Sequence, residues 1–307
     1  MSPVYGCEFP SERDAISLAD WAEAVMLVEE ISEFSEADLR GRIVEQAEDE
    51  VADEELPGRR HVEDILREVA RRQNFAGVGY PFRRSEYGIE RADDRLLGIY
   101  SFLLYLSIPE TPFSKRIYSN AVTPLFDRVG AAALADLLGT KANTIRFGWP
   151  ISEDRPTGPR TALKWLAGQL GLEHDTTAPI SPNMKDGGVD VVLWRPFQDG
   201  RGGFPILLAQ CTVGRTEWQK KGRDIQRPTW QRYLGLGCLP TTALVLPFCV
   251  HQPDRFEEWG IASQDVSYVI DRIRLLELLA DVEPTDIVQH GQIQQWTSEC
   301  ERELALA

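Results

Sequence analysis

Two polar side chains interrupt strand-like apolar runs in the second half of the chain. Asp190 lies within the run from Gly188 to Trp194, and Gln210 ends the run Ile206-Leu207-Leu208-Ala209. An ionised carboxylate among apolar residues is costly unless a cation or a hydrogen-bond donor meets it. If the two runs pair as a hairpin, both polar groups project near one end of a sheet. Oxygen ligands from neighbouring strands suit Mg²⁺.

The segment from Arg195 to Arg232 is basic, although the chain as a whole carries a net charge of −15. It holds eight Lys or Arg residues against three acidic ones, Asp199, Glu217 and Asp224. Such a segment is typical either of a surface that faces phosphate groups or of a solvated helix face with mixed charge. Charge alone does not decide between the two.

These residues resemble the PD-(D/E)xK nuclease superfamily, which restriction enzymes and many DNA-repair nucleases share. Its signature is an Asp early in one strand, followed in the next strand by an acidic or Gln residue and a Lys two positions later. Asp190 corresponds to the Asp, and the preceding Asp186-Gly187-Gly188 is similar to the variant of Mrr-like members. Gln210 corresponds to the Gln variant. The resemblance covers roughly residues 151–280, about 40% of the chain.

The sequence departs from this signature at Thr212, which stands where the family usually places Lys. Threonine cannot supply a positive charge. In several branches of the superfamily the lysine comes from the following helix, and the resemblance therefore points to Lys221, a turn after Trp218, with Lys220 as second choice. The string QCTVGRTEWQKK is similar to that of bacterial members linked to phage defence.

The resemblance implies a DNA endonuclease that uses Mg²⁺ or Mn²⁺ to hydrolyse phosphodiester bonds, as an effector in bacterial defence against phage or other foreign DNA. The metal ligands would be the side chains of Asp190 and Gln210 and the backbone carbonyl of Cys211. An upstream carboxylate commonly completes such a site, and Glu153 is the candidate. The basic residues expected to contact the DNA backbone are Arg215, Lys220, Arg223 and Arg227.

Each of these residues also has a structural interpretation. Asp190 follows two glycines and would cap a turn, Gln210 would satisfy buried backbone groups, and Lys221 would be a surface lysine. Thr212 then marks a degenerate nuclease fold that serves as a binding or scaffold subunit of a defence complex. A third hypothesis is a nuclease that is active only with a partner, because the net charge of −10 on residues 1–150 repels DNA.

The elements expected after residue 150 run helix, strand, strand, helix, strand, strand, helix. This order predicts an α/β sandwich, and the resemblance implies a restriction-endonuclease-like mixed sheet flanked by helices. The expected ranges are 159–172 (helix), 188–194 and 204–213 (strands), 216–234 (helix), 241–249 and 266–270 (strands) and 271–279 (helix). Residues 151–307 are therefore expected to form the nuclease domain.

Residues 1–150 are expected to form an acidic, mostly helical domain that binds a partner or regulates the nuclease. Residues 75–87 are rich in Gly and aromatic residues, which predicts a loop or short hairpin. Ser17 or Asp20 is the expected cap of the first helix. The expected helices are 16–34, 61–73, 93–107 and 120–138.

Residues 133–146 have the pattern of a helix-turn-helix motif: a helix, Gly139 at the turn, and a short basic second helix. The second helix would be very short before Gly148-Trp149-Pro150 breaks it. An ordinary helix that ends at Gly139 is the favoured interpretation.

Several classes of protein are disfavoured by composition. The five cysteines form no CxxC pair and the four histidines no HxxxH or HxH pair, which argues against a zinc hydrolase. The longest apolar stretch, Leu96–Ile108, is too short to span a membrane, and no signal peptide is evident. We expect a cytoplasmic protein whose partners are DNA and a protein bound through the helical domain, with assembly into a homo-oligomer as an open alternative.

Overall fold

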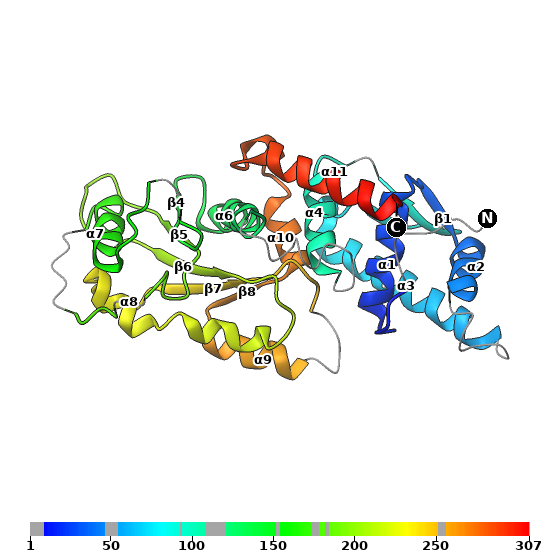
Figure 1. The fold of residues 1–307 in the computed structure, drawn as a ribbon, viewed down its shortest axis with the longest axis horizontal. Helices are drawn as coiled ribbons and strands as arrows, with labels where there is room; N and C mark the ends of the chain where they lie inside the picture. The colour runs from blue at the N-terminus through cyan, green and yellow to red at the C-terminus, as the bar shows by residue number, and fades with distance from the viewer. Residues whose placement is uncertain are drawn as a thin grey trace. The chain divides into compact units, whose positions relative to one another are not determined.

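The chain divides into two compact units (Figure 1). The first comprises Met1–Ser119, Pro247–His251 and Arg272–Ala307, and the second Asn120–Leu246 and Gln252–Asp271. The computed structural model describes residues 9–46, 55–92, 94–108, 121–151, 154–172, 178–181, 184–250 and 256–306. The second unit begins before the boundary expected at residue 150, and the C-terminal residues return to the first unit.

The first unit combines helices with a small antiparallel sheet. Its described helical elements are α1 Ala15–Val28, α2 Glu36–Gln46, α3 Glu55–Ala76, η1 Gly77–Gly79, α4 Leu97–Ser107, α10 Arg272–Leu279, η4 Pro284–Asp286 and α11 His290–Leu306. Its strands β1 Glu33–Ser35, β2 Phe82–Arg84 and β3 Gly88–Arg91 pair antiparallel in the order β1-β3-β2. The loop or short hairpin expected for residues 75–87 is found only in part: α3 and η1 extend to Gly79, and β2 pairs with β3, which begins beyond that range at Gly88.

Helix α1 is capped by Asp14, whose carboxylate accepts hydrogen bonds from the backbone N–H groups of Ile16 at 2.9 Å and Ser17 at 3.0 Å. The predicted caps Ser17 and Asp20 were wrong. Both lie inside the helix, and Asp20 is buried and pairs with arginines. A capping carboxylate must precede the first helical turn to reach these N–H groups, and Asp14 does.

A cluster of buried charged residues holds the first unit together, and we call Asp20, Glu23, Arg72 and Arg272 the buried arginine cluster. Arg72, from α3, lies 2.7 Å from a carboxylate oxygen of Asp20 and 2.9 Å from one of Glu23, both on α1. Arg272, on α10, binds Asp20 at 2.5 Å. Because the partners on α1 and α10 are 252 positions apart, the cluster explains why the C-terminal segment belongs to this unit.

The second unit is a mixed α/β fold around a five-stranded sheet of order β4-β5-β6-β7-β8. Strands β4, β5 and β6 pair antiparallel, whereas β7 and β8 add in parallel. The strands are β4 Asn143–Arg146, β5 Val191–Trp194, β6 Ile206–Cys211, β7 Thr241–Val245 and β8 Tyr268–Ile270. The described helical elements are α6 Thr123–Leu138, α7 Pro159–Gln169, η2 Trp218–Asp224, α8 Arg227–Leu234 and α9 Phe256–Asp265.

Helices cover both faces of this sheet. The α6 face includes Cys211, since Gly130 of α6 approaches its Sγ atom closely. On the other face, Val192 and Leu208 join a core with residues of α7 and α8, among them Trp230. Side chains alternate between the two faces along a strand. The side chain of Gln210 therefore lies on the same face of the sheet as Leu208, and that of Cys211 lies on the face covered by α6.

The expected helix over residues 216–234 is interrupted. It consists of η2 and α8, separated at Ile225 and Gln226, and Pro228 lies in the first turn of α8, where its missing N–H costs nothing. Two further elements, β4 and α9, were not predicted.

The helix-turn-helix interpretation is wrong. Helix α6 ends at Leu138, with Gly139 at φ +91°, as the favoured interpretation expected. Residues 143–146, which would have begun the second helix, form strand β4 instead.

None of the helices in the described residues is long and apolar enough to cross a membrane.

Candidate functional site

The backbone of Asp190 is fixed between strands β4 and β6, immediately before β5. Its N–H donates to the carbonyl of Ala209 at 2.8 Å, and its carbonyl accepts from the N–H groups of Phe147 at 2.7 Å and Gly148 at 2.9 Å. Gly187 and Gly188, which precede Val189 and Asp190, have φ values of +65° and +78°, a conformation that glycine adopts at no steric cost. The glycine turn therefore delivers Asp190 to the end of the sheet.

The carboxylate of Asp190 reaches the neighbouring strand. Its Oδ2 atom accepts a hydrogen bond from the backbone N–H of Cys211 at 2.8 Å, one residue beyond Gln210. Burial, and next the negative charge of Asp127, raise the pKa of Asp190 well above its usual range, while the Cys211 N–H opposes this. The carboxylate does not cap its own turn, because that role falls to Asp186, whose Oδ1 accepts from the Gly188 N–H at 3.0 Å.

Asp127, on α6, is the second carboxylate of this site, and sequence reasoning missed it. It is buried, and its Oδ2 accepts a hydrogen bond from Nε of Arg146 at 2.7 Å. Burial raises its pKa to about 6, although Arg146 acts to lower it. The available signal was helical spacing, since Asp127 lies three, four and seven residues before the buried Gly130, Ala131 and Leu134.

Two buried like charges make the protonation of this site sensitive to pH. The pKa of Asp127 is about 6 in the fold against an ordinary 3.8, so the folded state holds a proton that the unfolded state has released. Stability should therefore fall as pH rises between these values, by about 3 kcal/mol in all. We expect the unfolding free energy of wild type minus that of Asp127→Asn to decrease from pH 4 to pH 6.5, measured by urea denaturation. A difference that stays flat would contradict the assignment.

Gln210 contacts a different carboxylate, that of Asp224 at the end of η2. The Nε2 group of Gln210 donates to Oδ2 of Asp224 at 3.0 Å, whereas its Oε1 atom is buried without a hydrogen-bond partner. Lys221 lies 3.7 Å from the same Asp224 oxygen. Asp224 was also missed by sequence reasoning, although an acidic residue three positions after the candidate lysine was a visible signal.

The predicted site residues thus form two groups that meet at the end of β6. In the first group, the charges of Asp127 and Arg146 act on the Asp190 carboxyl group. In the second group, Asp224 contacts both Gln210 and Lys221. The link between the groups is the hydrogen bond from the backbone of Cys211 to Asp190. Glu153, the remaining predicted catalytic residue, lies outside the described residues.

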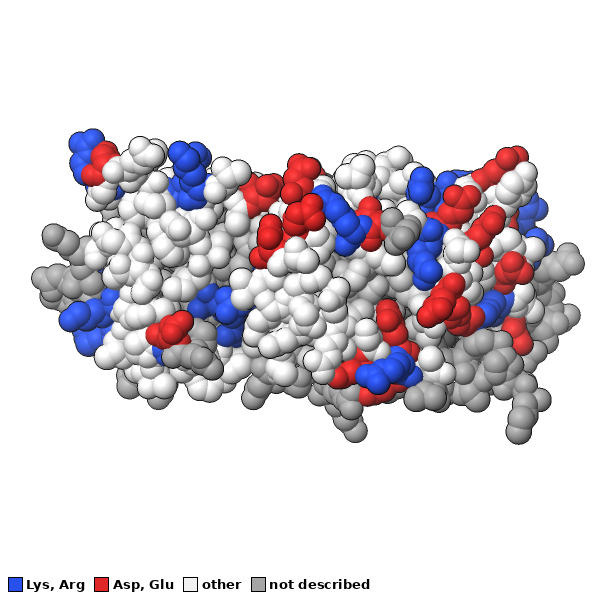
Figure 2. All heavy atoms as spheres, turned by 90° about the horizontal axis from the view of Figure 1, so that it is seen from above, with Lys and Arg blue, Asp and Glu red and all other residues white. Residues whose placement is uncertain are grey.

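The residues predicted to bind DNA make contacts within the second unit. Lys220 forms an ion pair with Glu217, Nε of Arg223 binds Asp265 at 2.7 Å, and Nε of Arg227 donates to a backbone carbonyl at 2.9 Å. The fourth, Arg215, is partly buried. On the face drawn in Figure 2, the described basic side chains lie in separate groups, several of them beside acidic ones.

The donor atoms fit a divalent cation in part. Among the described residues, no group of three or more His, Cys, Asp or Glu side chains could hold a metal ion. A cation at Asp190 would therefore need an amide or backbone oxygen as well, and the unpartnered Oε1 of Gln210 is such an acceptor. Burial raises the pKa of the Cys211 thiol well above its usual value, so a thiolate ligand is disfavoured.

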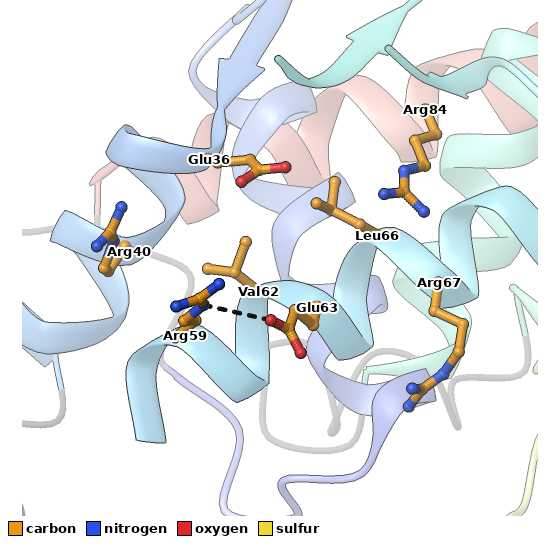
Figure 3. Close-up of a pocket in the computed structure, with 8 residues that line it drawn as sticks. All are labelled: Glu36, Arg40, Arg59, Val62, Glu63, Leu66, Arg67 and Arg84. Carbon is orange, nitrogen blue, oxygen red and sulfur yellow. Dashed lines mark ion pairs between the residues drawn. The ribbon is translucent and has the colours of Figure 1, made fainter. Parts of the chain in front are cut away.

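A separate pocket of about 670 Å³ lies in the first unit (Figure 3). Val62 and Leu66 are its buried apolar residues, and charged side chains surround them, with Arg59 paired to Glu63 at 3.4 Å. The other charged residues that line it are Glu36, Arg40, Arg67 and Arg84. Arginines and glutamates occur together here, so the pocket has no single sign of charge.

Comparisons with protein-family models, with curated proteins and with solved structures found no match for this chain.

Proposed function

We propose that the second unit is a metal-dependent DNA endonuclease of the restriction-endonuclease-like class. The observation that carries the proposal is the hydrogen bond that holds the Asp190 carboxylate at the end of the Gln210 strand, where the charge of buried Asp127 also acts on it. Two carboxylates that repel each other in a partly buried position are stabilised when a divalent cation binds them. The mixed sheet with helices on both faces is the architecture that the sequence resemblance implies.

In this proposal Asp190 and the Oε1 atom of Gln210 hold Mg²⁺ or Mn²⁺, together with the Cys211 carbonyl. Asp127 takes the place of the upstream carboxylate, for which Glu153 was the sequence-based candidate. A divalent cation held by these residues would supply Lewis-acid chemistry, by polarising a phosphoryl oxygen and lowering the pKa of water. Lys221 orients the attacking water or stabilises charge on the phosphate.

The basic residues position the nucleic acid without reading its sequence. Arg223 would exchange its partner Asp265 for a backbone phosphate, and Arg215 and Arg227 would contact neighbouring phosphates. Because this ion pair must open first, we expect binding to be weak and strongly dependent on salt concentration.

The direct test is to incubate the pure protein with supercoiled plasmid in Mg²⁺, in Mn²⁺ and in EDTA. The proposal predicts nicked or linear product with either metal and none with EDTA. Cleavage that persists in EDTA, or the absence of cleavage under all conditions with and without cell extract, would contradict it. The reactions with cell extract test the hypothesis that the nuclease is active only with a partner protein bound through the first unit.

The two candidate lysines are separated by a matched pair of substitutions. Both lysines are exposed, but Lys221 is linked through Asp224 to Gln210, whereas Lys220 pairs with Glu217. We expect Lys221→Met to lower the cleavage rate by about 10²-fold, the usual size for one lost charge-stabilising group, and Lys220→Met to change it less than threefold. The measurement is the initial rate of plasmid nicking at saturating metal. Equal effects would remove Lys221 from the mechanism.

A second candidate function is a binding or scaffold subunit of a defence complex with a degenerate nuclease site. Two observations favour it: Thr212 stands where the family places Lys, and Asp190 and Gln210 have separate side-chain partners. This alternative predicts no cleavage with any metal or partner, and no metal bound at Asp190.

A further inference from the structure

One carboxylate oxygen contacts both groups that the proposed reaction requires on the η2 side of the site. Oδ2 of Asp224 lies 3.0 Å from Nε2 of Gln210 and 3.7 Å from Nζ of Lys221. Asp224 also packs against the glycine turn before Asp190, since a Cβ on Gly188 would lie 2.7 Å from its backbone carbonyl and 2.8 Å from its Cβ. The backbone of Asp224 therefore lies against the glycine turn, and its half-exposed carboxylate reaches Gln210 on strand β6.

The chemistry of this contact fixes the orientation of the Gln210 amide. An ionised carboxylate only accepts hydrogen bonds, so the Gln210 group facing Asp224 must be the NH₂ and not the oxygen. The amide oxygen then points away from Asp224, and in the described structure it is buried with no hydrogen-bond partner. A buried acceptor without a donor is costly, and a cation at this position would satisfy it.

We propose that Asp224 is a positioning residue, which holds the Gln210 amide with its oxygen turned toward the metal and keeps Lys221 beside it. The inference rests on the proposed nuclease function and adds to it a residue that does not itself bind metal or substrate. Outer-shell hydrogen bonds of this kind typically change metal affinity by about 10–100-fold when removed.

The substitution Asp224→Asn tests this role with little change in size. An asparagine both donates and accepts, so the Gln210 amide would adopt either orientation. We expect the affinity for Mn²⁺, measured from the electron paramagnetic resonance signal of free Mn²⁺ without DNA, to fall about tenfold. Asp199→Asn, which removes a negative charge from an exposed turn, is the matched control and should leave the affinity within twofold.

A second genetic background separates orientation from simple structural support. In the Gln210→Glu variant both side-chain oxygens are acceptors, so orientation no longer matters and the carboxylate of Asp224 repels its neighbour. Asp224→Asn should then strengthen Mn²⁺ binding or leave it unchanged. A residue that merely supports the fold would weaken binding in both backgrounds.

The same orientation is observable without metal. In the ¹⁵N-labelled metal-free protein, the side-chain NH₂ of Gln210 should give one pair of resonances in wild type and a shifted or doubled pair in Asp224→Asn. Weaker Mn²⁺ binding by Asp224→Asn in the Gln210 background but not in the Gln210→Glu background, with this spectral change, supports the inference. Equal effects, or an unchanged NH₂ signal, overturn it while leaving any metal-dependent cleavage intact. Failure of Asp190→Ala to reduce Mn²⁺ binding overturns the proposed function as well.

Discussion

Replacing Asp190 by alanine is expected to reduce metal-dependent DNA cleavage by at least about 10³-fold, which corresponds to about 4 kcal/mol of lost transition-state stabilisation. The physical reason is that Asp190 is the charged ligand of the proposed site, since Gln210 is neutral. The measurement is the initial rate of plasmid nicking at saturating Mg²⁺.

Asp190→Asn is the sharper second variant, because its side-chain oxygen still accepts from the Cys211 N–H while the charge is lost. Both variants remove repulsion from Asp127, and we therefore expect them to remain folded. Asp199→Ala, in an exposed turn, is the control and should retain full activity. Cleavage by either Asp190 variant above one tenth of the wild-type rate would remove the site assignment.

Replacing Arg72 by methionine is expected to lower the free energy of unfolding by about 3–5 kcal/mol. Arg72 is fully buried, and Asp20, Glu23 and Glu68 all lie within 2.9 Å of its guanidinium nitrogens. Methionine fills a similar volume but leaves three buried carboxylates without that positive charge.

Urea denaturation of the full chain at neutral pH measures this effect. Arg67, on the same helix, is exposed and pairs only with Asp64 among its described ion-pair partners. Arg67→Met should therefore change stability by less than about 0.5 kcal/mol. If the two variants were equally stable, the buried arginine cluster would not be the element that holds the first unit together.

The central strands of the second unit could be predicted because their sequences are nearly continuous apolar runs. Residues 191–194 and 206–211 are strands in the structure, within the predicted ranges 188–194 and 204–213. Strand β4 lies at the edge of the sheet and begins with Asn143 and Thr144, which are exposed, so its composition gives no strand signal.

The division of the chain could not be predicted from composition. It depends on contacts such as that between Asp20 and Arg272, which join α1 to a segment near the C-terminus. No local sequence pattern predicts which distant residue neutralises a buried charge.

The site was predictable where a polar residue interrupts an apolar strand, and not where the contact is purely tertiary. Asp190 and Gln210 were visible for the first reason. Asp127 and Asp224 were missed because a carboxylate on a helix is ordinarily solvated, and only the fold shows that one is buried and the other faces Gln210. Likewise, one charge of the basic segment is neutralised from outside it, because Asp265 pairs with Arg223.

The most direct test of the proposed nuclease site is a crystal structure of the protein soaked in Mn²⁺, with anomalous scattering used to locate the metal. The site described here predicts a Mn²⁺ ion bound by a carboxylate oxygen of Asp190 and Oε1 of Gln210, with the Gln210 amide still donating to Asp224. A manganese peak elsewhere in the second unit, with Asp190 bound only to the Cys211 N–H, would contradict it.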